Sequence, residues 1–180
     1  MYCFWAKGYE ATSVRDLADE MGLTSASLYN AFGDKRSLYR RALDHYLESS
    51  VHERVRRLEA MKAPLAAITS FLAEVIERSV TDKQRRGCML VNSALEVAPH
   101  DPELRKLVAD ELIYIEAFFR RCVAAGQEDG TVTSRQSAHD MGKLLLSVLL
   151  GIRVLARTRP QRSVLEAAAG AALAALAPAT

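Results

Sequence analysis

Residues 13–35 read SVRDLADEMGLTSASLYNAFGDK, and the pattern predicts two short helices on either side of a turn. The first helix begins with a capping box, because Ser13 is followed three residues later by Asp16. Gly22 ends this helix at a position that favours positive φ, and Thr24 is the expected N-cap of the second helix. Two short helices joined by a turn that contains glycine predict a helix-turn-helix.

The second short helix has an apolar side and a side of small and polar residues. Leu28 and Phe32 form the apolar side, which we expect to pack inward. The other side suits a helix that enters the major groove, because small residues let the backbone approach and hydroxyls can bind phosphate. The alternative is an unrelated helical bundle in which these polar residues form a solvated face. On the DNA-binding interpretation, the candidate contacts are Ser25, Ala26, Ser27, Tyr29, Asn30 and Lys35.

Outside this stretch the chain keeps a helical period, and no strand pattern or internal repeat is found. We therefore expect an all-α fold of about nine helices. Pro64 and Asp101-Pro102-Glu103 are expected to begin helices. Gly126 is expected to end one, and Thr133 with Gln136 is expected to form the capping box of the next.

The composition is that of an ordinary globular protein. Of the 180 residues, 49% are hydrophobic and 26% charged, and 24 basic against 22 acidic residues leave a net charge of only +2. The three cysteines are an odd number and widely spaced, which favours a reducing, cytoplasmic location over a secreted disulfide framework. No apolar run reaches the roughly 18 residues needed to span a bilayer, so we expect no membrane partner.

The spacing of turn signals changes along the chain. Short segments separated by turns fill the first 50 residues or so, and long helical patterns follow. We expect a helix-turn-helix domain over residues 1–45 and a helical body over residues 46–180, with residues 34–60 as the connecting helix.

Residues 4–43, FWAKGYEATSVRDLADEMGLTSASLYNAFGDKRSLYRRAL, resemble the DNA-binding domain of TetR-family transcriptional regulators. The resemblance implies a three-helix helix-turn-helix domain followed by a helical domain for ligand binding and dimerisation. The sequence departs from the family pattern at Asn30-Ala31, where aromatic or histidine residues are common in the family. The first helix also looks truncated. The positions that the resemblance implies for DNA contact are Thr12, Thr24, Ser25, Ser27, Tyr29, Asn30 and Lys35.

The last two helical patterns predict a homodimer interface. Residues 144–155 are apolar on nearly every face, and residues 167–176 are rich in small side chains that let helices approach closely. The alternative is a monomer in which both helices are interior. On the dimer interpretation, the interface residues are Leu145, Val148, Ile152, Leu165, Ala169, Ala172 and Leu176.

The middle helices contain several aromatic residues and a short polar strip. The family resemblance implies a pocket for an unidentified small-molecule effector in this region, and the alternative is that these aromatics are plain core. The expected pocket residues are Phe71, Met89, Asn92, Tyr114 and Phe118. A cavity of about 300 Å³ or more would favour a ligand-responsive protein over a constitutive regulator.

No pattern points to catalysis, a cofactor or a metal. Phosphate-binding loops, nucleophile elbows and zinc-protease motifs are missing from the sequence, and its four histidines are scattered. We therefore expect a homodimeric, ligand-responsive repressor that binds double-stranded operator DNA and is not an enzyme. The alternative is a helical small-molecule-binding or enzymatic protein whose helix-turn-helix is vestigial.

Overall fold

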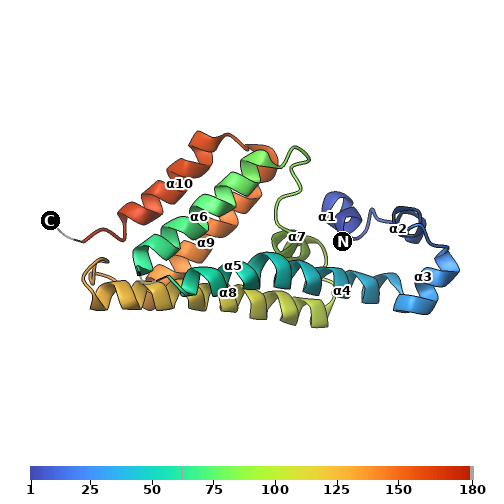
Figure 1. The fold of residues 1–180 in the computed structure, drawn as a ribbon, viewed down its shortest axis with the longest axis horizontal. Coiled ribbons are helices and arrows are strands. Elements are labelled where there is room, and N and C mark those ends of the chain that lie inside the picture. The colour runs from blue at the N-terminus through green and yellow to red at the C-terminus, as the bar shows by residue number, and fades with distance from the viewer. Residues whose placement is uncertain (62, 179–180) are drawn as a thin grey trace. The chain divides into compact units, whose positions relative to one another are not determined.

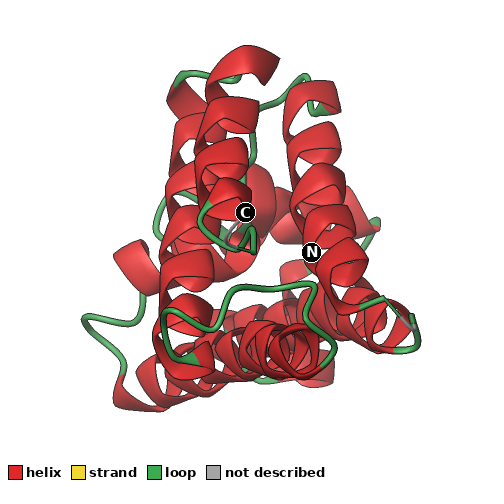
Figure 2. Cartoon of the chain, turned by 90° about the vertical axis from the view of Figure 1, so that its left-hand side faces the viewer, coloured by secondary structure: helices red, strands yellow, loops and turns green. Residues whose placement is uncertain are grey.

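The computed structural model describes residues 1–61 and 63–178, and these fold into helices and loops (Figure 2). No strand occurs among them, so the predicted all-α class is confirmed. Figure 1 labels the helices in chain order. Their bounds are α1 Tyr2–Lys7, α2 Val14–Met21, α3 Ser25–Phe32, α4 Lys35–Tyr46, η1 Leu47–His52, α5 Glu53–Glu59, α6 Pro64–Thr81, α7 Met89–Glu96, α8 Pro102–Glu128, α9 Ala138–Thr158 and α10 Arg162–Ala174.

The connecting helix predicted over residues 34–60 is present. Asp34 is its N-cap, where the Asp34 Oδ1 accepts a hydrogen bond from the Ser37 backbone N–H at 2.6 Å. The elements α4, η1 and α5 follow one another without a break, with η1 as a widened π-helical turn. Counted this way, residues 1–61 and 63–178 hold nine helical segments, as expected.

Two predicted helix boundaries are wrong. Gly126 does not end α8, which continues to Glu128; a Cβ at Gly126 would lie 2.5 Å from the Val132 Cγ2, so glycine serves close packing here. Thr133 does not cap α9 either, because α9 begins only at Ala138; the Thr133 backbone N–H instead donates to the Leu176 carbonyl. The N-cap of α9 is Ser137. Its hydroxyl accepts a hydrogen bond from the backbone N–H of Asp140, in a Ser-x-x-Asp pattern.

The chain divides into two compact units. The first contains Met1–Val51 and Cys88–Val108, and the second contains His52–Gly87 and Ala109–Thr180. The prediction of a single boundary after residue 45 did not anticipate that α7 and the start of α8 would join the helix-turn-helix. The sequence does not show that residues 88–108, which are distant along the chain, pack with the helix-turn-helix.

Each unit has its own apolar core. In the first unit, the aromatic rings of Phe4, Tyr9 and Tyr39 contact one another with centroids 4.9–6.2 Å apart. In the second, helices α6, α9 and α10 pack together, as Figure 1 shows, and α5 packs on α6. Phe71 and Phe118 are fully buried there, and their ring centroids lie 5.4 Å apart. No helix in the described residues is long and apolar enough to cross a membrane.

Candidate nucleic-acid interface

The helix-turn-helix has the local geometry that its sequence predicts. The Ser13 hydroxyl accepts from the Asp16 backbone N–H at 3.0 Å, and the Asp16 carboxylate accepts from the Ser13 N–H at 2.8 Å. Gly22 takes the left-handed conformation, φ 65° and ψ 30°, and its N–H bonds to the carbonyls that end α2. Thr24 caps α3 by accepting from the Ser27 N–H at 3.1 Å. These hydrogen bonds fix the turn that sets α3 against α2.

Helix α3 is anchored by one side chain and exposed along the rest of its length. Leu28 is fully buried, whereas Tyr29 is 48% exposed. The first turn of the helix also presents backbone N–H groups that have no partner within the helix, which suits phosphate binding. The predicted contacts that lie exposed on or next to α3 are Thr24, Ser25, Ala26, Ser27, Tyr29 and Asn30.

Lys35 is partly buried at the start of α4. Its ammonium lies 4.4 Å from the centre of the Tyr9 ring and 3.5 Å from the Glu10 carbonyl oxygen. Both interactions position the ammonium without neutralising it, so it stays available to a phosphate. The structure thus explains how the side chain is held, which the sequence did not indicate.

Thr12 does not belong to this surface. It is fully buried, and its hydroxyl donates to the Gly8 carbonyl at 2.6 Å. A side chain with no exposed area cannot contact DNA, so the implied role for Thr12 is corrected to a structural one. It ties the end of α1 to the loop before α2.

Sequence reasoning missed the contacts that join the helix-turn-helix to α7 and the start of α8. Arg36 binds the Asp101 carboxylate through its Nε at 2.5 Å and the Glu103 carboxylate through its Nη2 at 2.6 Å. The Arg36 guanidinium lowers the pKa of Asp101 to about 2, so this carboxylate is ionised at neutral pH. Glu96 accepts from the Glu10 N–H at 2.8 Å. These pairs lie 65 or more residues apart, and no sequence signal marks them.

A buried hydroxyl pair adds to the same connection. The Tyr39 hydroxyl lies 2.7 Å from the Ser93 Oγ, and burial raises the pKa of Tyr39 to about 12. Asn92, expected to line a pocket, is half-buried on α7. Ser93 therefore serves the packing of α7 on α4.

Most of the predicted dimer residues lie on the inward faces of α9 and α10, and Leu176 follows the end of α10. Six of them are buried inside the protomer, with exposures of 0–5%, and only Val148 is partly exposed. The predicted helical period is present, but side chains buried within the protomer are not exposed to a second copy. The sequence does not reveal this, because apolar residues on two faces of a helix look alike. The buried six are Leu145, Ile152, Leu165, Ala169, Ala172 and Leu176.

A different set of small and apolar side chains on these helices faces solvent. Leu144 is 38% exposed and Val154 is 46% exposed. A Cβ added at Gly151 would meet nothing within 4 Å. We call this set the outward strip: Leu144, Ser147, Gly151 and Val154 on α9, with Ala167, Ala171 and Ala174 on α10.

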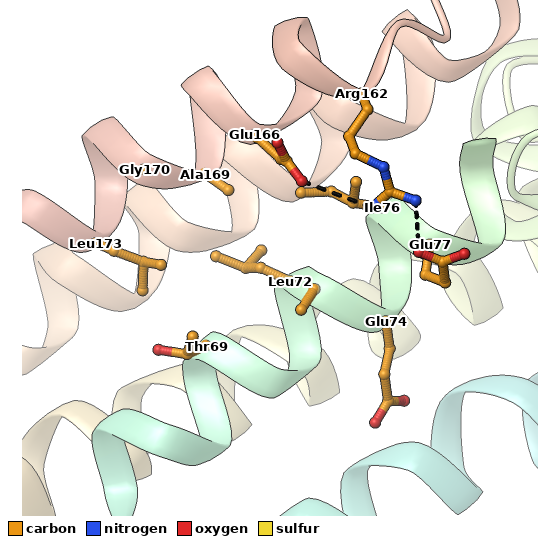
Figure 3. Close-up of a pocket in the computed structure, with 11 residues that line it drawn as sticks. Thr69, Leu72, Glu74, Ile76, Glu77, Arg162, Glu166, Ala169, Gly170 and Leu173 are labelled. Carbon is orange, nitrogen blue, oxygen red and sulfur yellow. Dashed lines mark hydrogen bonds and ion pairs between the residues drawn. The ribbon is translucent and has the colours of Figure 1, made fainter.

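The second unit contains a cavity of about 450 Å³ between α6 and α10. Figure 3 shows its apolar lining, which includes Leu72 and Leu173, and a charged edge where Arg162 bridges Glu77 and Glu166. A smaller cavity of about 230 Å³ lies beside Cys122, whose pKa burial raises to about 11. A thiol of such high pKa is a poor nucleophile at neutral pH.

None of the expected pocket residues lines either of these two cavities. Phe71 and Phe118 are fully buried against each other and Phe119, and Tyr114 packs on the His52 ring. Met89 is buried in the first unit. In the described residues, no three side chains are grouped so that they could hold a metal ion.

Two family models match the chain. The model described as "Bacterial regulatory proteins, tetR family" matches residues 1–42. The model described as "Tetracyclin repressor-like, C-terminal domain" matches residues 64–172. Together they cover the helix-turn-helix and most of the helical body.

Relatives and solved structures agree with these models. The uncharacterised HTH-type transcriptional regulator YezE of Bacillus subtilis (strain 168) is 31% identical over 134 residues, which are 74% of this chain and 69% of that protein. The repressor ComR of Escherichia coli (strain K12) is 24% identical over 175 residues, covering 96% and 83%. A cysteine mutant of the TetR-family regulator CifR, solved with 26-bp operator DNA, has a TM-score of 0.84 at 30% identity, covering 97% and 91%.

Proposed function

Because this chain belongs to the TetR family of bacterial regulatory proteins, we propose that it represses transcription as an operator-bound homodimer that releases DNA when an effector binds. It is a DNA-binding transcriptional regulator. The observation that carries the proposal is the exposed first turn of α3 on a helix-turn-helix whose caps are all formed. Several relatives, ComR among them, are named repressors, which supports repression.

We place α3 in the major groove. Thr24, Ser25 and Ser27 surround its N-terminus and would bind phosphate oxygens, together with the free backbone N–H groups of the first turn. Tyr29 and Asn30 reach further and would contact phosphates or base edges. Lys35 would hold a phosphate beside the groove.

We place the dimer contact on the outward strip. Its exposed α10 residues from Ala167 onward carry no charge, which is unusual for a helix face in water. Small residues at Gly151 and Ala171 allow a second copy of the same helices to approach closely. A two-fold dimer would present two copies of α3 to half-sites about 34 Å apart.

Effector binding belongs to the second unit in this proposal. The 450 Å³ cavity between α6 and α10 is within the size range of small-molecule sites, which supports a ligand-responsive protein over a constitutive one. The proposal is tested by selecting bound duplexes from a random DNA pool and fusing the selected site to a promoter reporter. Reporter expression that rises when the gene is deleted supports repression; no enrichment of any sequence contradicts the proposal.

We expect Tyr29→Ala to weaken binding to the selected site by about 1–3 kcal/mol and to leave the melting temperature unchanged, because Tyr29 is exposed on α3. Fluorescence anisotropy with labelled duplex measures the affinity. Tyr29→Phe is the matched variant: it keeps the ring and removes only the hydroxyl, so the difference between the two gives the contribution of the hydroxyl. Unchanged affinity in both variants would contradict the placement of α3 in the major groove.

Lys35→Ala is expected to weaken binding to specific and random duplexes alike. Because Lys35 would contact a phosphate, its loss should also reduce the slope of log affinity against log salt by about one unit. Arg15→Ala is the matched control, since Arg15 is a fully exposed cation on α2 that lies 3.9 Å from Asp19. If the loss of affinity instead depended on the DNA sequence, Lys35 would contact a base edge.

A further inference from the structure

Two arginines are buried inside the second unit. Arg54 on α5 is 3% exposed and Arg153 on α9 is 8% exposed. A guanidinium keeps its charge at any physiological pH, and moving it out of water is costly unless a partner compensates the charge. The partners of these two side chains therefore decide what the site can do.

Arg54 is incompletely paired. Its Nε donates to the Glu74 carboxylate at 3.2 Å, but that carboxylate also accepts from the Arg57 Nη2 at 2.7 Å. The Nη2 of Arg54 is buried and has no hydrogen-bond partner in residues 1–61 and 63–178. Burial and the nearby charges of Arg153 and Arg78 lower the pKa of Arg54.

Arg153 has only a neutral partner. Its Nη1 donates to the Ser79 Oγ at 3.4 Å, and Ser79 in turn donates to the Val75 carbonyl at 2.7 Å. No carboxylate among the described residues lies within ion-pairing distance of this guanidinium. Glu74 thus serves Arg54 and Arg57 together, while Arg153 has no ion-pair partner in the part of the chain that the structure describes.

An aromatic surface lies beside these charges. The Arg54 guanidinium lies 5.4 Å from the centre of the Phe71 ring, and Phe71 contacts Phe118 and Phe119. Phe71, Val75 and Ser79 recur every four residues and so share one face of α6. The cavity between α6 and α10 is lined by Leu72 and Ile76 and also by Glu74, the partner of Arg54, so the arginine site adjoins the cavity at Glu74.

We propose that Arg54 and Arg153 bind the anionic group of the effector, a small organic carboxylate. The inference rests on the proposed ligand-responsive function and names the chemical class of the ligand. A carboxylate can accept from the unpaired Arg54 Nη2, for which arginine offers planar donor geometry, and the nearby charge of Arg153 favours an anion at this position. A single negative charge also supplies the counterion that Arg153 lacks among the described residues.

The first test is thermal melting of the wild-type protein with matched ligand pairs. The probes are benzoate, phenylacetate and hexanoate, each compared with its neutral amide at the same ionic strength. At least one carboxylate should raise the melting temperature progressively with the logarithm of its concentration, while its amide has little effect. The proposal is overturned if no carboxylate stabilises the protein more than its amide does.

The second test replaces each buried guanidinium by an uncharged side chain of similar length. Arg54→Met and Arg153→Met should melt no lower than the wild type without ligand, because each removes a poorly compensated charge and Glu74 keeps Arg57. Both should bind the stabilising carboxylate at least about tenfold more weakly. A large fall in ligand-free melting temperature in both variants would instead make the arginines structural.

Two controls locate the effect. Arg57→Met removes the half-exposed partner of Glu74 and should keep the response to carboxylate. Ala73→Phe fills the cavity between α6 and α10 and should also keep it; loss of the response in this variant would move the ligand to that cavity and overturn the proposal. Operator binding without ligand is measured in every variant. Normal operator binding without any carboxylate response refutes the anion site alone, whereas wild-type protein that binds no operator refutes the proposed function alone.

Discussion

A Gly151→Arg variant is expected to fold normally, to be monomeric and to lose most of its operator affinity. Gly151 is exposed in the middle of α9, and a Cβ there would meet nothing within 4 Å of the same protomer. Arginine is also a better helix former than glycine, so the isolated protomer should not lose stability. Two copies of α9 in close contact, however, have no room for two arginines and would bring their charges together.

The loss of affinity follows from the loss of the second half-site. A dimer binds its second half-site as an intramolecular event, which contributes about 10²–10⁴-fold to overall affinity. Sedimentation velocity measures the oligomeric state, and anisotropy with the selected duplex measures the affinity. The matched control is Ala109→Arg, which adds the same exposed side chain to α8 and should remain dimeric. A dimeric Gly151→Arg variant with full operator affinity would rule out the outward strip as the interface.

The caps and turns of the helix-turn-helix could be predicted from the sequence because they are local. The caps formed by Ser13 with Asp16, by Gly22 and by Thr24 each act within four residues of the group they bond, and all four residues take the expected roles. The exposed side of α3 followed from the same local pattern.

Burial and long-range pairing could not be predicted in this way. A threonine hydroxyl before α2 is as compatible with a phosphate contact as with the buried hydrogen bond from Thr12 to the Gly8 carbonyl. The bridge from Arg36 to Asp101 depends on where α8 begins in space. Arg54 and Arg153 looked like ordinary charged residues, because only the packing of α5, α6 and α9 buries them.

The connection between α3 and the second unit runs through α4, which continues into η1 and α5. Arg54 lies on α5, at the end of this helical segment, and Arg36 and Tyr39 lie near its start. An effector that binds Arg54 would therefore bind the same run of consecutive helical elements that carries Arg36 and Tyr39.

Two neighbouring alanines lie on different faces of α10, Ala172 on the inward face and Ala171 on the outward strip. The same substitution is therefore expected to affect protomer stability at one position and dimer formation at the other. Ala172 is 4% exposed, whereas Ala171 is exposed. Ala172→Glu buries a carboxylate among apolar side chains and is expected to cost about 3–5 kcal/mol, a large part of the stability of a typical domain. Ala171→Glu leaves the charge in water, so the protomer should melt as the wild type does.

The pair is matched in composition, helix and substituted residue, so only the face differs. Chemical denaturation gives the free energy of unfolding, and sedimentation of the folded protein gives the oligomeric state. We expect Ala172→Glu to lose stability and Ala171→Glu to keep it while dissociating into monomers, because Ala171 lies on the outward strip. The reverse result, a stable monomer from Ala172→Glu and a stable dimer from Ala171→Glu, would restore Ala169, Ala172 and Leu176 as the interface that the sequence predicted.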